Sequence, residues 1–164
     1  MSQLSQLVSF LNEALPERLR GFDSWIDNQK LTPSYKALGN DQYRLTITTY
    51  DGVIELDKFP YRQIDPGVVY AMVEVWIIEH ASELRSDMGI SGADIDAELY
   101  DEESALVTIT VPLVDELVIA PDENGMIPFM GKKWSVVTPL YDVAESAEIY
   151  GADSTGAAVG GQPK

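Results

Sequence analysis

Cysteine is absent from the 164-residue sequence, and histidine occurs once, at position 80. Without cysteine there is no disulfide, no thiolate metal site and no thiol nucleophile. The glycine patterns of phosphate-binding loops, dinucleotide-binding loops and serine nucleophile elbows are also missing. The 27 carboxylates include no pair that the sequence singles out for acid–base catalysis. We therefore expect a protein that is not an enzyme and has no catalytic residue, metal or cofactor.

Cations are scarce, with 11 lysines and arginines against 27 acids and a net charge of −16. Residues 1–90 contain 13 acids and 8 basic residues, a net charge of −5, whereas residues 91–164 contain 14 and 3, a net charge of −11. A field of this sign repels phosphates, so specific binding of DNA or RNA is not expected.

Long hydrophobic runs are absent as well. The longest, residues 67–78, is interrupted by Glu74. A membrane-spanning helix needs about 20 apolar residues, so no membrane partner is expected. The lack of cysteine fits assembly in a reducing cytoplasm.

The sequence contains two stretches with helical periodicity. Leu4, Leu7 and Leu11 predict an amphipathic helix over residues 2–15, which ends before Pro16. A second, long helix is predicted from Asp65-Pro66 to about residue 85, apolar on most of its sides. A helix of that kind must be covered on more than one side.

Strand patterns occupy much of the remaining chain. Alternating apolar and polar residues predict strands, in chain order, over residues 42–50, 53–56, 93–100, 105–119 and 126–137. We expect a polar loop over residues 28–41, a turn at Asp51-Gly52 and a break near Pro112. The predicted fold class is α+β, a long helix packed on a mostly antiparallel sheet.

The domain organisation follows from where these patterns end. Residues 1–137 are predicted to form one domain, and residues 138–164 a C-terminal extension. Residues 151–164 are rich in glycine and alanine, which cannot bury enough apolar surface to order themselves. We expect this segment to be an arm that takes part in assembly.

One acidic series is the first candidate site. It comprises Asp94, Asp96, Glu98, Asp101, Glu102 and Glu103. Carboxylates at this spacing can bind calcium or magnesium, but the glycine and glutamate that a calcium loop requires are replaced here by Leu99 and Ala105. The favoured interpretation is the solvent face of a strand followed by a charged turn.

A second candidate is a docking point for an acidic partner. Lys132 and Lys133 form an isolated basic pair, and Tyr150 is grouped with them as a docking residue. The alternative is that the two lysines lie in an ordinary solvated turn.

The order and spacing of these elements resemble the tail completion protein R family of contractile-tailed phages. The resemblance covers about residues 4–120. The stretches that carry it are, in order, Ala14–Pro16, Trp25–Asp27, Tyr43–Asp51, Trp76–Ile77, Glu83–Leu84, Ala93–Asp96 and Asp115–Val118.

The resemblance implies a structural virion protein, a tail terminator that caps the head-proximal end of a contractile tail. Such a subunit forms a ring, six-fold by resemblance, stops polymerisation of tube and sheath, and offers a face to the head connector. The genome passes through the lumen without specific binding, and we expect the acidic series to face that lumen. Two alternatives stay open: a head–tail connector or other tail subunit, and a small acidic cytosolic binding domain.

Overall fold

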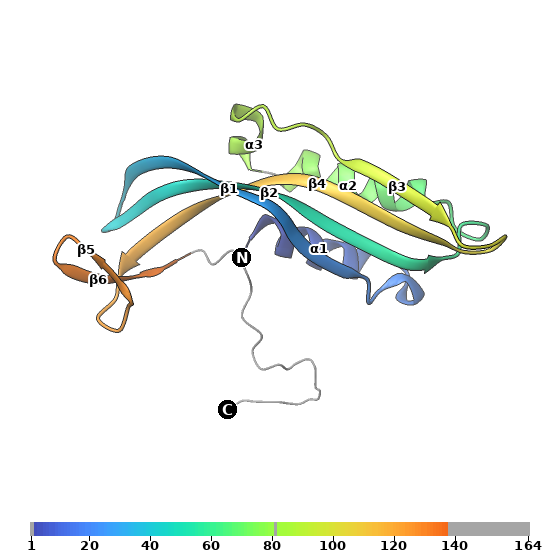
Figure 1. The fold of residues 1–164 in the computed structure, drawn as a ribbon, viewed down its shortest axis with the longest axis horizontal. Helices are drawn as coiled ribbons and strands as arrows, with labels where there is room; N and C mark the ends of the chain where they lie inside the picture. Colours follow the sequence, from blue (N-terminus) through green and yellow to red (C-terminus); the bar gives the residue numbers. More distant parts are fainter. Residues whose placement is uncertain (1, 81, 138–164) are drawn as a thin grey trace.

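The computed structural model describes residues 2–80 and 82–137, so the predicted C-terminal arm and Tyr150 lie outside the described residues. The elements are, in order, α1 (Gln3–Ala14), the short 3-10 helix η1 (Glu17–Leu19), β1 (Asp23–Gly39), β2 (Gln42–Phe59), α2 (Gly67–His80), α3 (Glu83–Asp87), β3 (Asp94–Leu99), β4 (Ala105–Pro121), β5 (Ile127–Phe129) and β6 (Lys132–Val136). The strands form one antiparallel sheet in the order β1-β2-β4-β6-β5, and β3 pairs with β4 beside β6. The long strands arch across the molecule, as Figure 1 shows.

The predicted α+β class, with a long helix packed on the sheet, is wrong. The protein is mostly β, because three strands of 17, 18 and 17 residues build a curled half-barrel and the helices are short. The sequence pattern underestimates the sheet because much of β1 is exposed on both faces. Such a strand lacks the apolar alternation that identifies half-buried strands.

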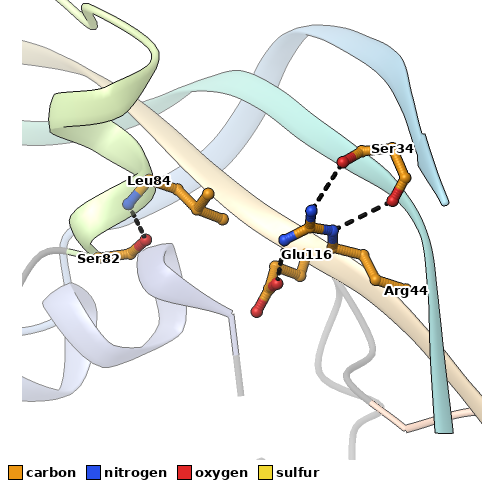
Figure 2. A network of polar contacts seen from close by, with 5 residues as sticks. All are labelled: Ser34, Arg44, Ser82, Leu84 and Glu116. Carbon is orange, nitrogen blue, oxygen red and sulfur yellow. Dashed lines mark hydrogen bonds and ion pairs between the residues drawn. The ribbon is translucent and has the colours of Figure 1, made fainter. Parts of the chain in front are cut away.

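The predicted helix over residues 65–85 is divided into α2 and α3. Its first part ends at His80, and α3 begins after Ser82, which has an extended backbone at φ −64° and ψ 147°. The Ser82 hydroxyl accepts a hydrogen bond from the Leu84 backbone N–H at 3.0 Å and so caps α3 (Figure 2). None of the described helices has the length and apolar character needed to cross a membrane.

The segment predicted as a loop, residues 28–41, forms most of β1 and its hairpin turn. Asn40 and Asp41 have φ values of 52° and 58°, and positive φ at both central residues is what a tight two-residue hairpin turn requires. The register of β1 against β2 shifts between Asp27 and Lys30 and again between Pro33 and Lys36. These bulges allow a polar strand that contains proline to follow the curve of β2.

The expected turn at Asp51-Gly52 and the expected break at Pro112 are also wrong. Asp51 pairs with Asp27 on one side and with Pro112 on the other, so β2 and β4 pass through both positions. The Pro112 carbonyl accepts a hydrogen bond from Arg85 Nε at 3.0 Å. In an antiparallel strand the N–H and C=O of one residue point the same way, so the missing N–H of Pro112 also faces away from β2. No β2–β4 hydrogen bond is lost there.

The core lies between one face of the sheet and the helices α1 and α2. We call this the helical face; β4 supplies Val107, Ile109, Val111 and Leu113 to it, all fully buried. The opposite face, called the open face, carries the alternate residues of the same strands. Both helices therefore cover the same side of the sheet, and neither of them covers the open face.

A buried polar group fixes the start of α1 to the sheet. The Tyr50 hydroxyl, on β2, donates to Asp115 Oδ2 at 2.5 Å and accepts from the Leu4 backbone N–H at 3.2 Å. The Asp115 carboxylate, on β4, also accepts from the Gln3 backbone N–H at 3.2 Å. Two free N–H groups of the first helical turn are thereby satisfied by the sheet, which sets the position of α1. Burial, and then the nearby Asp115 carboxylate, raise the pKa of Tyr50, so the hydroxyl stays a donor.

Tyr50→Phe tests this contact. The substitution leaves the Leu4 N–H without its partner and removes one of the hydrogen bonds to Asp115 Oδ2, which keeps the one from the Gln3 N–H. A buried unsatisfied group costs about 1–3 kcal/mol. We expect the free energy of unfolding in urea to fall by about that amount. Tyr35→Phe removes a hydroxyl from an exposed tyrosine and serves as the control; equal effects of the two substitutions would contradict the interpretation.

The pH dependence of stability offers a second test. Burial raises the pKa of the Asp115 carboxyl above its ordinary value of 3.8, although the hydrogen bonds from Tyr50 and Gln3 oppose the shift. Because the pKa is higher in the folded than in the unfolded protein, the stabilisation from this group is complete below the unfolded value and is lost as pH rises through the folded value. Wild type should therefore lose stability relative to Asp115→Asn over that range. Urea titrations at several pH values measure the two free energies of unfolding, with the exposed Asp96→Asn as control. A wild type that gains stability relative to Asp115→Asn as pH rises would contradict the shift.

Candidate assembly surfaces

The acidic series predicted from the sequence is divided between two places. Asp94, Asp96 and Glu98 lie on β3, and all three are exposed. In the register they stand opposite Thr110, Thr108 and Leu106 of β4, which places them on the open face. Among the described residues no group of three or more acidic or histidine side chains is arranged to hold a metal ion.

The other half of the series forms the turn between β3 and β4. Asp101 Oδ1 accepts hydrogen bonds from the Glu103 N–H at 2.8 Å and the Ser104 N–H at 2.7 Å. These backbone hydrogen bonds lower the pKa of the Asp101 carboxyl, and the one from Glu103 has the largest effect. The Glu102 carbonyl accepts a hydrogen bond from Arg62 Nε. Asp101 therefore stabilises the turn, and it contributes to the surface charge of this end together with Glu102 and Glu103, since all three are exposed.

Further carboxylates, which the sequence pattern did not reveal, join the β3 group on the open face. The register aligns Asp23 with Glu55, Glu55 with Thr108, and Thr108 with Asp96. One row along the sheet also brings Asp27 opposite Asp51. The resulting acidic face comprises Asp23, Asp27, Asp51, Glu55, Asp94, Asp96 and Glu98. Finding it from sequence would have required the pairing of four strands and the position of the bulge after Asp27.

The acidic face contains no ion pair. Within residues 2–80 and 82–137 the one salt bridge joins Arg44 Nη1 to Glu116 Oε2 at 2.8 Å. Arg44 also donates from Nη2 to Ser34 Oγ at 2.8 Å and from Nε to the Ser34 carbonyl at 3.2 Å, so it connects β1, β2 and β4 (Figure 2). The cation lies beside the β1 bulge, away from the rows that carry the acidic face.

The predicted docking lysines lie at the far end of the sheet. Lys132 and Lys133 are exposed on β6, opposite Phe129 and Pro128 of β5. They line a shallow depression together with Asp122 and Glu123. A small aromatic cluster supports this hairpin, in which the buried Trp134 donates from Nε1 to the Phe129 carbonyl at 2.6 Å. Both lysines are therefore exposed on a hairpin that the aromatic cluster supports.

Helix α2 has two apolar faces. Val69, Val73 and Trp76 pack into the core, and Trp76 is only 2% exposed. Val68, Ala71, Val75 and Ile78 form a second stripe, which is exposed to solvent, and Ile78 is 79% exposed. The spacing of three, four and three residues places these side chains on one line along the helix. We call this line the α2 outer stripe; α1 leaves it uncovered although the two helices are in contact.

The surfaces described above are those of an assembly subunit. The described residues place their distinctive chemistry on the exterior, as an acidic sheet face and an apolar helix stripe, which is the pattern of a subunit that assembles with other proteins. The comparison with known families agrees. The family of the P2 phage tail completion protein R (GpR) matches residues 1–139, and the chain belongs to this family. It is therefore a structural component of a phage tail.

One curated relative of the chain is a phage protein. A protein of Haemophilus phage HP1 (strain HP1c1), described as an uncharacterized 19.2 kDa protein in the rep-hol intergenic region, is 26% identical over 145 residues. The alignment covers 88% of this chain and 87% of the relative. No solved structure matches the chain.

The α2 outer stripe predicts that two α2 positions can be changed without loss of stability. Val75→Gln with Ile78→Gln replaces exposed side chains by a good helix former, so the free energy of unfolding should change by less than about 0.5 kcal/mol. Trp76→Ala on the buried face should cost about 3–5 kcal/mol. Chemical denaturation of the three proteins measures both effects, and a large loss in the glutamine variant would mean that the stripe is part of the core.

Proposed function

We propose that the protein caps the head-proximal end of a contractile tail and stops polymerisation of tube and sheath. Membership of the tail completion family over residues 1–139 is the observation that carries this proposal. The α2 outer stripe supports it, because a folded protein rarely leaves a continuous apolar line on a helix unless another subunit covers it.

We propose that the α2 outer stripe is the contact with the end of the tail. Glu74 and Glu79 flank the stripe and are exposed. Two copies that met through this stripe about a two-fold axis would bring these acids close together, which disfavours self-association there. A tail subunit with a neutral or basic apolar groove fits the stripe better.

In this proposal the subunits form a closed ring, six-fold as the family resemblance implies, and the acidic face lines its channel. Ring symmetry repeats the seven carboxylates of the face in every copy. Attractive phosphate contacts would hold DNA in the channel, whereas a wall on which carboxylates outnumber cations lets the genome pass. Glu102 and Glu103, at the end of β3, extend the same charge to the rim.

Phage particles made without the protein test the proposed activity. If the chain stops polymerisation, tails assembled in its absence should vary widely in length under the electron microscope. Wild-type protein supplied in trans should restore uniform tails, and the Val75→Gln/Ile78→Gln variant should not. Glu74→Gln/Glu79→Gln, on the same helix, is the matched control. Tails of normal length that fail to join heads would instead identify a head–tail connector.

A further inference from the structure

The outer edges of β1 and β3 have no partner strand within the part of the chain that the structure describes. β1 pairs with β2 alone, and β3 pairs with β4 alone. Charged and apolar side chains alternate along the paired parts of both strands, and apolar side chains of both strands are exposed. Leu31 of β1 is 60% exposed and Leu99 of β3 is 64% exposed. Free strand edges are templates for pairing with another chain.

The two edges match each other in charge. Lys30 and Lys36 pair with Thr49 and Arg44 of β2 and lie on the open face of β1. Neither lysine forms an ion pair within the described residues. On β3 the open face carries Asp94, Asp96 and Glu98. The same face of the sheet is therefore basic at one edge and acidic at the other.

The apolar side chains of the two edges match as well. On β1, Leu31 lies opposite Thr48 on the helical face, and the ring of Tyr35 stacks on Tyr43 with centroids 5.6 Å apart. On β3, Ile95 and Leu99 lie opposite the buried Ile109 and Ala105, so they also belong to the helical face. All of these edge side chains except Tyr43 are strongly exposed.

We propose that β3 of one copy pairs antiparallel with residues 30–37 of β1 in a second copy of this chain. In the order β1-β2-β4-β3 every neighbouring pair is antiparallel, so β1 and β3 run in opposite directions. A second copy placed beside β3 in the same orientation therefore presents β1 antiparallel to it, with open face beside open face. Lysines then meet carboxylates on one face, and leucine and tyrosine meet isoleucine and leucine on the other.

Charge also selects the register of this contact. The first part of β1 carries Asp23 and Asp27 on the open face. Pairing β3 with that part would set carboxylates directly opposite carboxylates, which is destabilising. A shift along β1 to Lys30 and Lys36 replaces the repulsion by opposite-charge pairs. The contact thus joins two different surfaces, and repetition of such a contact gives a ring when the rotation between copies closes.

Lysine and proline at a sheet edge also protect proteins against unwanted pairing, and β1 contains Pro33 as well as its lysines. If protection were their role, reversing the lysine charges would not weaken self-association. The proposal rests on the proposed ring, because it assumes that copies associate. Exchanging the charges of the two edges distinguishes pairing from protection.

The experiment uses the full chain and two variants, Lys30→Glu/Lys36→Glu and Asp94→Lys/Asp96→Lys. Each variant has edges of the same charge sign, so sedimentation should show at least a tenfold weaker self-association than wild type. A one-to-one mixture restores opposite edges at every contact, and we expect alternating assemblies in which both variants are present. The variant with all four changes should also assemble, and circular dichroism confirms folding. Lys58→Glu reverses the charge of an exposed lysine of β2 that belongs to neither edge, and it should assemble like wild type.

The possible failures separate the two proposals. Suppose that wild type forms rings. If the charge variants then assemble like wild type, or if their mixture does not assemble, the β1–β3 contact is wrong. The proposed ring survives in that case with another interface. If wild type remains a monomer both alone and with purified tails, self-association itself is overturned, and the ring with it.

Discussion

The antiparallel pairing of β2 with β4 is the interaction on which the rest of the structure depends. It runs from Tyr43 opposite Ile119 to Phe59 opposite Ala105; β1, β3 and β6 each pair with one of these two strands, and β5 attaches through β6. Because the pairing fixes which side chains share a face, it gathers the apolar residues of both strands under α1 and α2. The same alternation places Asp51 and Glu55 of β2 on the open face, where Val53 and Val114 are buried beside them. One register therefore builds the core and the acidic face together.

The acidic face has an energetic cost that the isolated subunit only partly offsets. Asp23 stands directly opposite Glu55 and Asp27 opposite Asp51, and like charges in such pairs destabilise a sheet. Hydrogen bonds give some compensation, from Asn28 Nδ2 to Asp51 Oδ2 at 2.8 Å and from Trp25 Nε1 to Asp27 Oδ2 at 3.1 Å. Violations of this kind in a folded protein are expected at functional surfaces. Repulsion of a polyanion is a function that would use the carboxylates of such a surface directly.

The sequence predicted those parts of the fold in which one face is buried. The first helix was predicted from residue 2, and Ser2 is its N-cap, since its hydroxyl accepts from the Ser5 N–H at 3.1 Å. The alternation of Val107, Ile109 and Val111 predicted the core face of β4 correctly. It failed for residues 28–39 of β1, which were expected to form a polar loop, because an exposed edge strand has no buried face to produce a pattern. The partition of the predicted long helix at Ser82 also has no local signal beyond one residue that can cap a helix.

The candidate surfaces were less predictable than the helices and strands, because the residues that share a surface depend on the register between paired strands. The β3 carboxylates were visible as an alternating series, whereas Asp23 and Glu55 join them only through the pairing of four strands. The bulges in β1 matter in the same way. The extra residue after Asp27, where Asn28 has a φ of 53°, returns Lys30 to the open face. Bulges also increase the local twist of a strand. In the proposed assembly these bulges place the basic edge opposite the acidic edge of the next copy, and their twist contributes to the rotation that closes the ring.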